Sequence, residues 1–318
     1  MSIPLKERQT LLKFIERNVS VAPQDLDEGI GTVYERVVID DYFRDLQKRF
    51  NIMTVLENPA DGVTGVPGMN SLEFARNGGT VAMSNPSVKM LEGARAVWEK
   101  QGLIDQATFT RCEVDDIPFA DNSFDLVWNY CMFERFLDPG PVVSEMKRVS
   151  NKYVLLMTQN VYNWGTVFHK VYHNIGDLEW DHGYGQQMTF PAIRKAVRAQ
   201  GMRIVEEGTV DIPPWLDTWD MPLRGVLKQL LGAVGMKWEW KIAGAGAPTE
   251  VHHTANGHSH TGNGHSHNGN GHSHNGSNGR QAKGSASGTV NIVRNIEHNL
   301  PTWFRKYQAH HLYVLAEK

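Results

Sequence analysis

The segment from Val81 to Val127 constrains the fold of this chain more than any other. It begins with a short apolar strand that ends at Asn85-Pro86-Ser87, and an amphipathic helix follows at once. A turn rich in Pro, Asp and Asn then leads into a second apolar strand that starts near Phe124. A strand, a helix, a loop and a strand in this order form the repeating unit of a parallel α/β sheet. Because ligands bind beyond the carboxyl ends of such strands, we expect the polar side chains there to face one crevice.

Apolar runs and helical spacing extend this pattern along the chain. Apolar runs predict strands at 52–56, 81–83, 108–112, 124–130, 153–158 and 202–210. Helical spacing predicts helices between them at 69–77, 86–101, 139–149 and 190–200. Two amphipathic helices, at 5–20 and 33–50, precede the first strand, and the alternating run at 310–317 predicts a last strand. The predicted fold class is α/β, with helices on both faces of a mostly parallel sheet.

Several short motifs follow these elements in a fixed order. They are an acid, a glycine-bearing loop, an Asn-Pro-Ser turn, an Ile-Pro-Phe turn and a Ser-Phe-Asp strand start: Glu57, Gly62, Gly65, Gly68, Asn85–Ser87, Ile117–Phe119 and Ser123–Asp125. In this order the motifs resemble those of class I S-adenosylmethionine (SAM) dependent methyltransferases that act on small molecules. The resemblance covers residues 50–160 well and residues 161–318 more loosely. It implies a Rossmann-like, mostly parallel sheet of seven strands with an antiparallel last strand.

The resemblance also implies which residues bind the cofactor SAM. They are Glu57, Gly62, Gly65, Gly68, Asn85, Glu113, Val114 and Asn129. The acid and the glycines would hold the charged amino-acid end, because glycine lets backbone N–H groups approach closely. Asn85 would bind the ribose diol, Glu113 and Val114 the adenine, and Asn129 would lie under the methionine portion. Asp115 and Asp116 are interpreted as solvated turn residues.

Two of the predicted cofactor-binding motifs depart from the family pattern. Asn58, Pro59 and Ala60 stand where the family has closely spaced glycines, so the loop must be wider. Asn85 stands where the family has an acid, and a neutral amide forms hydrogen bonds weaker by about 1 kcal/mol than those of a carboxylate. The chain is interpreted as a SAM-dependent methyltransferase acting on an unidentified small molecule. The alternative is a catalytically inactive methyltransferase-like module used in binding or assembly.

The segment after the fifth strand is where family members build the pocket for the methyl acceptor. Here it contains Glu179–Tyr184, in which His182 is the candidate catalytic base because histidine titrates near neutral pH. A structural role for His182 in an ordered loop is the alternative. His169 and His173 stand one helical turn apart, which suits a metal ion or simply marks one face of a helix. The aromatic segment 213–219 could cap an apolar acceptor or pack in the core.

A Gly-His-Ser-His unit repeats three times between residues 257 and 274. Gly, Asn and Ser dominate its surroundings, so residues 249–288 are expected to form a flexible loop without a core. Closely spaced neutral imidazoles bind Zn, Ni or Cu. The candidate metal ligands are His258, His260, His265, His267, His272 and His274. The alternative is a low-complexity expansion without a metal role in the cell.

Composition limits the classes of partner. A net charge of -3 lacks the basic surplus expected of a nucleic-acid-binding protein. Two cysteines, Cys112 and Cys131, fit a reducing compartment better than a disulfide framework. No apolar run is long enough to cross a membrane, and the amino terminus lacks the apolar stretch of a signal peptide. We therefore expect a cytoplasmic protein whose partner is a small-molecule acceptor rather than nucleic acid or a membrane; the sequence does not predict the oligomeric state.

These observations predict four parts of the chain. Residues 1–50 form a helical flank, and residues 51–212 form the methyltransferase-like α/β core. Residues 213–300 form an insertion that includes the His-rich loop, and residues 301–318 supply the last strand of the core. The insertion is the largest departure from the family plan.

Overall fold

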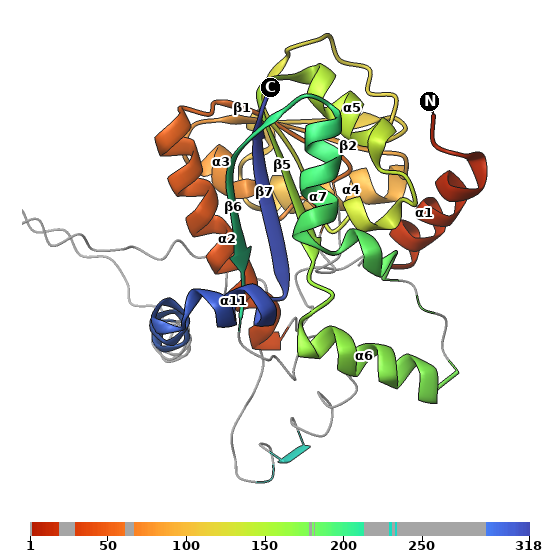
Figure 1. Cartoon of the computed structure of the whole chain (residues 1–318). Coiled ribbons are helices and arrows are strands. Elements are labelled where there is room, and N and C mark those ends of the chain that lie inside the picture. Colours follow the sequence, from red (N-terminus) through yellow and green to blue (C-terminus); the bar gives the residue numbers. More distant parts are fainter. Residues whose placement is uncertain are drawn as a thin grey trace, which may run out of the picture.

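The computed structural model describes residues 2–18, 29–60, 67–177, 180, 182–212, 229–230, 233 and 291–318. Its centre is a seven-stranded sheet with the order β3-β2-β1-β4-β5-β7-β6 (Figure 1). The strands are β1 (Thr54–Glu57), β2 (Thr80–Asn85), β3 (Ala107–Arg111), β4 (Phe124–Tyr130), β5 (Ser150–Gln159), β6 (Arg203–Val210) and β7 (His311–Glu317). Neighbouring strands are parallel except where β7 pairs with β5 and β6. The predicted mostly parallel sheet with an antiparallel last strand is confirmed.

Helices cover both faces of the sheet, as predicted. They are α1 (Leu5–Asn18), α2 (Gly29–Phe50), α3 (Leu72–Arg76), α4 (Val88–Lys100), α5 (Gly140–Val149), α6 (Trp164–Ile175), α7 (Phe190–Ala199) and α11 (Thr302–Gln308), with short 3-10 turns η2 (Ile104–Gln106), η3 (Phe133–Arg135) and η4 (Gly185–Gln187). One core cluster contains Phe14 of α1, Met146 of α5 and Ile193 of α7. The other contains Phe43 of α2 and Trp98 of α4. Truncating one such buried ring costs about 3–5 kcal/mol, so both clusters hold the sheet in place.

Side-chain caps start two of these helices close to the carboxyl edge of the sheet. Ser87 Oγ accepts a hydrogen bond from Met90 N at 3.3 Å where α4 begins. Thr189 Oγ1 accepts one from Ala192 N at 3.3 Å where α7 begins. A cap of this kind stabilises a helix by about 1 kcal/mol. Ser87 therefore fixes the turn that directly follows the last residue of β2.

Two helices lie outside the helix ranges predicted from the sequence, although the spacing of His169 and His173 allows a helix in the first of them. α6 lies within residues 159–185 and extends away from the sheet (Figure 1), and residues 291–299 are also helical. The exposed apolar residues of α6 recur at helical spacing: Trp164, Val167, Phe168, Val171 and Ile175. Intervening polar and aromatic residues obscure this period in the sequence. The segment 213–219 and the whole His-rich tract lie outside the described residues, and the four-part division stays a prediction.

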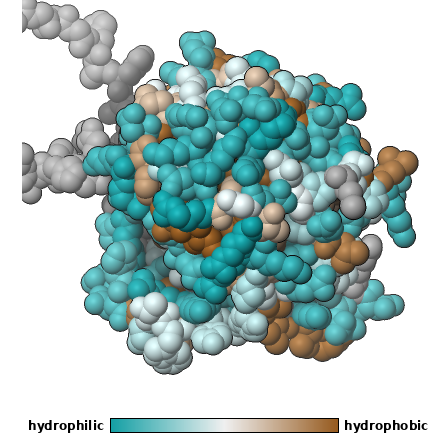
Figure 2. Space-filling model, turned by 45° about the horizontal axis from the view of Figure 1, so that its top comes forward, coloured by the Kyte–Doolittle hydropathy of each residue, from teal (hydrophilic) through white to brown (hydrophobic). Residues whose placement is uncertain are grey.

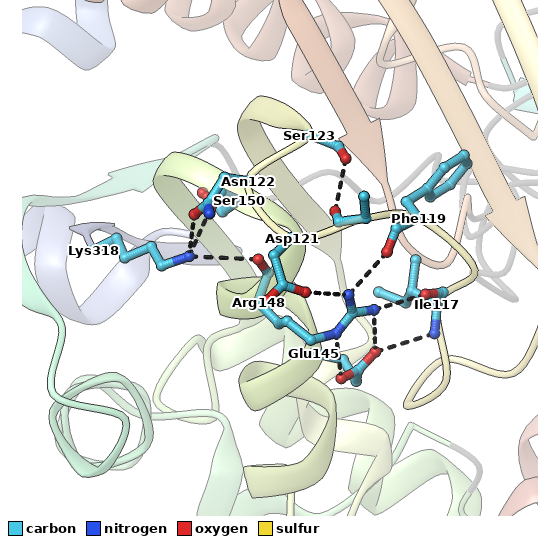
Figure 3. A network of polar contacts seen from close by, with 10 residues as sticks. Ile117, Phe119, Asp121, Asn122, Ser123, Glu145, Arg148, Ser150 and Lys318 are labelled. Atoms are coloured by element: carbon cyan, nitrogen blue, oxygen red, sulfur yellow. Dashed lines mark hydrogen bonds and ion pairs between the residues drawn. The ribbon is translucent and has the colours of Figure 1, made fainter.

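Arg148 joins α5 to the turn that follows β3 (Figure 3). Its guanidinium donates to the carbonyl oxygens of Ile117 and Phe119 at 2.7 and 2.8 Å. It also donates to the two carboxylate oxygens of Glu145 at 2.9 and 2.8 Å. Glu145 in turn accepts a hydrogen bond from Ile117 N at 3.2 Å. These contacts hold the turn, and with it the predicted adenine-binding residues just before it, against the core.

The surface of the protein carries scattered apolar patches. The face in Figure 2 is mostly hydrophilic, and its hydrophobic side chains gather in a few separate areas. Scattered apolar side chains are normal on a folded protein. Within the described ranges, no helix combines the length and the apolar character needed to cross a bilayer.

Candidate functional site

The predicted cofactor-binding residues lie at one edge of the sheet. Glu57 ends β1, Asn85 ends β2, and Asn129 is the next-to-last residue of β4. These strands are neighbours, and the three residues are buried, with exposures of 1%, 0% and 1%. Glu113 and Val114 follow β3, which pairs with β2. Because all four strands are parallel, their carboxyl ends meet at the edge where ligands bind in such sheets.

The segment after β1 contacts the ends of two other elements. Asn58 Nδ2 donates to the carbonyl oxygen of Val114 at 2.9 Å. Asn58 Oδ1 accepts from Ser84 Oγ at 2.7 Å, and Ala60 N donates to the carbonyl oxygen of Ser84 at 2.8 Å. The residues that replace the family's glycines therefore bridge β1, β2 and the turn after β3.

Of the three predicted glycines, the structure describes Gly68, while Gly62 and Gly65 lie outside the described residues. Gly68 has a φ of +70°, and a Cβ atom there would lie 2.7 Å from Met83 Sδ. Its carbonyl oxygen accepts a hydrogen bond from Trp98 Nε1 at 3.1 Å. Only glycine suits this position, which packs the loop against β2 and α4. A cofactor role for the three glycines stays a prediction.

Glu57 and Asn85 are both hydrogen-bonded within the protein. Ser71 Oγ donates to Glu57 Oε2 at 2.5 Å. The Asn85 amide donates to the carbonyl oxygen of Ala60 at 2.6 Å and accepts from Ser87 N at 2.8 Å. An ionised carboxylate at position 85 could not donate to that carbonyl, which gives a physical reason for Asn at this position. Contact between Asn85 and a ribose stays a prediction.

Arg8 of α1 reaches the turn that follows β3. Its guanidinium lies 3.1 Å from Glu113 Oε2 and 2.8 Å from Asp115 Oδ1. Asp115 also accepts from Ile3 N at 2.8 Å, and its side chain is 1% exposed. The expectation that Asp115 is solvated is therefore wrong, because α1 covers it. Glu113 keeps 45% of its side chain exposed and thus retains surface for a ligand.

Two buried amide oxygens at this edge have no hydrogen-bond partner within the described part of the chain. They belong to Asn129 and Asn70. The amide nitrogen of Asn129 contacts Met146 Sδ at 3.5 Å, and Asn70 precedes Ser71, which binds Glu57. An unpaired buried carbonyl costs about 1–3 kcal/mol. Both oxygens are suited to accept hydrogen bonds from a ligand, which fits the ammonium group expected at this edge.

His182 lies beside the two histidines of α6. Its ring centroid is 4.5 Å from that of His169 and 5.4 Å from that of His173, and those two centroids are 4.8 Å apart. Trp180 packs against all three rings, most closely against His182 at 4.7 Å. The sequence analysis identifies each histidine but gives no sign that His182 approaches the other two.

Glu134 of η3 is a buried carboxylate that the sequence analysis does not identify. It accepts hydrogen bonds from Thr158 Oγ1 at 2.7 Å and Gln159 N at 3.2 Å, and burial raises its pKa above the usual range of a glutamate. Its carbonyl oxygen accepts from Tyr184 N at 2.8 Å. The available signal is a single acid in the apolar run CMFERF. Glu134 anchors the loop that follows His182 to the end of β5.

An apolar pocket lies between α6 and the residues that follow it. It has a volume of about 290 Å³ and is lined by Val161, Val167, Val171, Trp180 and Met188, among others. Lys170 and Asn174 supply polar atoms to the same lining. Trp180 therefore contacts both the pocket, which it lines, and the ring of His182, against which it packs.

Comparison with known proteins gives one family and several relatives. Residues 63–156 match the family described as a methyltransferase domain. The ubiquinone/menaquinone biosynthesis C-methyltransferase UbiE of Xanthomonas oryzae pv. oryzae is 28% identical over 144 residues, which cover 41% of this chain and 57% of that protein. Methyltransferase GfsG of Streptomyces halstedii is 35% identical over 74 residues, 23% of this chain and 27% of that protein. The chain therefore spans little more than half the length of the first relative and about a quarter of the second.

A solved structure shows a partial likeness to this chain. The SAM-dependent methyltransferase from Aquifex aeolicus aligns with a TM-score of 0.39 and 20% identity, over 53% of this chain and 83% of that one. The strand order and the strand directions of this chain define its fold, with β7 antiparallel between β5 and β6.

Proposed function

We propose that this chain, which carries a class I SAM-dependent methyltransferase domain, transfers a methyl group from SAM to a small, largely apolar molecule. The observation that carries the proposal is the cluster at the carboxyl edge of the sheet, where Glu57, Glu113 and Asn129 lie at or after the ends of β1, β3 and β4. Methyl transfer from a sulfonium requires mainly in-line positioning, with a base where the acceptor must lose a proton. The residues that bind and orient the two substrates therefore carry most of the function.

When bound, SAM supplies a methyl group on a positively charged sulfur. In this proposal Glu57 and the buried amide oxygens of Asn70 and Asn129 hold the charged amino-acid end, because each accepts hydrogen bonds. Glu113 accepts a hydrogen bond from the adenine amino group after it separates from Arg8, with Val114 beside it. Asn85 would bind the ribose with the amide hydrogen and the lone pair that its hydrogen bonds to Ala60 and Ser87 leave unused. Gly62, Gly65 and Gly68 are candidates for the loop around the amino-acid end.

The apolar pocket beside α6 supports an apolar acceptor. Its volume of about 290 Å³ lies near the lower end of the range for small-molecule sites. Three valines, Met188 and the face of Trp180 offer apolar contact, and Lys170 can pair with a polar or anionic substituent. An acceptor that enters this pocket is expected to be a small molecule of mixed character with a dominant apolar part.

His182 is the candidate base for an acceptor that loses a proton. Its partner Trp180 lines the acceptor pocket, and its own ring is partly exposed. A neutral imidazole can accept a proton through its unprotonated ring nitrogen. Replacement of His182 by Asn should therefore lower the rate for an O–H or N–H acceptor and leave affinity for SAM unchanged.

A binding or assembly module without catalysis is the second candidate function. It is favoured by the hydrogen bonds that already occupy Asn85 and by the ion pair that engages Glu113. In that case neither SAM nor its demethylated product would bind, and the apolar pocket would serve a different ligand.

Metal binding by the His-rich tract is a separate proposal that rests on sequence. The six histidines His258, His260, His265, His267, His272 and His274 would bind Zn, Ni or Cu with modest affinity, because no rigid geometry is expected of a Gly- and Asn-rich segment. Deleting residues 252–275 should then remove this binding and leave SAM binding intact. Loss of SAM binding in the deletion would contradict the proposal.

A cytoplasmic location is consistent with the two thiols. Neither Cys112 nor Cys131 forms a disulfide within the described part of the chain. Burial raises the pKa of Cys112 to about 11, so its thiol stays protonated at neutral pH. Cysteines that form no disulfide are usual in a reducing compartment, which supports the proposed location.

Isothermal titration of the full-length protein with SAM and S-adenosylhomocysteine tests the proposed activity. We expect saturable binding of both, weakened about fivefold to tenfold by Glu113→Gln or Asn129→Leu, since each removes an acceptor worth about 1 kcal/mol. Glu99→Gln, on the exposed side of α4, serves as the matched control and should bind as the native protein does. The absence of heat with both compounds at high protein concentration would contradict SAM-dependent transfer and favour the non-catalytic module.

A further inference from the structure

We propose that His169, His173 and His182 form a three-histidine site for one divalent transition-metal ion. Zinc is the metal that we expect there. One nitrogen from each of the three rings lies within 4.8 Å of the other two. All three side chains are partly buried, so they are accessible to an ion yet held among neighbours. The site is distinct from the His-rich tract and does not depend on methyl transfer.

The positions of the rings match what a zinc ion requires. Zinc binds histidine nitrogen at about 2.0–2.1 Å, so three tetrahedral ligands have ring centroids about 5 Å apart. The observed separations are 4.5, 4.8 and 5.4 Å. The rings are inclined to one another by 40° to 76° rather than stacked in parallel, which lets their nitrogens converge. Small rotations of the side chains would bring the three nitrogens to the spacing of about 3.3 Å needed around one ion.

The two segments that supply the ligands are anchored independently. At the start of α6, Asn163 Oδ1 accepts hydrogen bonds from Gly165 N at 2.7 Å and Thr166 N at 3.3 Å. His169 and His173 follow one and two turns later, on the same face of the helix. Both are therefore presented by a helix whose first turn is fixed.

The loop that carries His182 is held at its other side by Glu134. Tyr184 N donates to the Glu134 carbonyl oxygen at 2.8 Å. Gly183 has a φ of +91°, and a Cβ atom there would lie 2.5 Å from the same oxygen. Trp180 Nε1 donates to the carbonyl oxygen of Gly183 at 3.0 Å, which closes the loop around His182. The histidine is thus set against α6 by contacts that do not involve its own ring.

Three neutral imidazoles favour zinc, cobalt, nickel or copper over calcium or magnesium, which prefer oxygen ligands. Three protein ligands are also the number found where zinc keeps a position open for water or a substrate. Here the fourth position would be open to water or to an acceptor oxygen, because all three histidines are only partly buried. A histidine that binds a metal through one nitrogen carries its proton on the other, so His182 cannot act as a base while it holds the ion.

Spectroscopic titration with Co²⁺ in place of zinc tests the site. The test uses a full-length variant in which the eight histidines from His252 to His274 are replaced by Asn, so that the tract cannot bind the ion. We expect one Co²⁺ per chain, with visible absorption of the intensity shown by four- or five-coordinate cobalt, and displacement by zinc. His169→Asn, His173→Asn or His182→Asn should each weaken binding by at least about 100-fold. His298→Asn, on an exposed helical position, is the matched control and should leave binding unchanged.

Two results would contradict the proposed metal site. One is the absence of cobalt absorption in the tract variant at saturating ion, and the other is binding that persists in all three single variants. If the tract variant fails to fold, the native chain and His182→Asn are compared instead, and the substitution must remove one cobalt ion per chain and the visible absorption. No SAM is present in these titrations, so their outcome is independent of the proposed methyl transfer.

Discussion

Arg8 and Glu113 form an ion pair between α1 and the turn after β3, with Arg8 Nη1 and Glu113 Oε2 3.1 Å apart. In this pair Arg8 occupies the Glu113 carboxylate, which we propose accepts a hydrogen bond from the adenine amino group. Arg8→Ala should therefore free Glu113 and tighten binding of S-adenosylhomocysteine by up to about fivefold. This factor corresponds to about 1 kcal/mol, the most that an exposed ion pair usually contributes. Lys6→Ala, exposed on the same helix, is the control for titration calorimetry. Weaker binding in Arg8→Ala would mean that α1 holds the cofactor rather than competing with it.

Asn85→Asp should destabilise the fold although it restores the acid of the family pattern. The substitution removes the hydrogen bond from the Asn85 amide to the carbonyl oxygen of Ala60 and places a carboxyl group at a fully buried position. We expect the free energy of unfolding in urea to fall by about 1–3 kcal/mol. The same substitution at the exposed Asn295, Asn295→Asp, should leave the free energy of unfolding nearly unchanged. An unchanged or raised stability of Asn85→Asp would show that the amide is not needed by the loop.

The ion pair of Arg148 and Glu145 should make stability depend on pH. The hydrogen bonds of Arg148 hold the pKa of Glu145 below its usual range. A carboxylate with a lowered pKa contributes stability that is present above its unfolded pKa of about 4.3 and is lost as the pH falls through the folded value. Arg148→Met should cost about 1–2 kcal/mol at pH 7, and the difference from the native protein should shrink below about pH 4. A pH-independent difference in urea denaturation would argue against this role.

Gly183→Ala should disturb the loop that carries His182. The new Cβ atom would meet the Glu134 carbonyl oxygen at 2.5 Å, and the φ of +91° adds strain. Gly102→Ala provides the control, because Gly102 also has a positive φ of +68° but no atom within 4 Å of the added Cβ. Both should lose about 1 kcal/mol from backbone strain, and Gly183→Ala should lose about 1–3 kcal/mol more as the loop shifts. Equal thermal unfolding of the two variants would contradict the close contact with Glu134.

The fold could be predicted from the sequence because buried parallel strands leave apolar runs that are hard to mistake. The run at 124–130 corresponds to β4, and the run at 153–158 lies within β5. The antiparallel direction of β7 came from the resemblance, since an alternating pattern alone does not reveal direction. The bounds of α6 are not predicted, although the spacing of His169 and His173 allows a helix there, because polar and aromatic residues interrupt its apolar stripe.

The site could be predicted in part, for reasons that lie in its contacts. Strand ends meet in any parallel sheet, so Glu57, Asn85 and Asn129 could be grouped without coordinates. The role of the Asn85 amide depends on the carbonyl of Ala60, whose position no local pattern fixes. The approach of His182 to α6 depends on Gly183 and Glu134, which are distant in sequence and meet only in the folded chain.

A crystal structure of the protein with S-adenosylhomocysteine tests the central claim most directly. We expect the product at the carboxyl edge of the sheet, with its adenine at Glu113, its amino group near Asn129 and Glu57, and its sulfur directed toward the pocket beside α6. The ion pair between Arg8 and Glu113 should be broken in that structure. A crevice without the product at saturating concentration, with Arg8 still paired with Glu113, would contradict SAM-dependent methyl transfer by this chain.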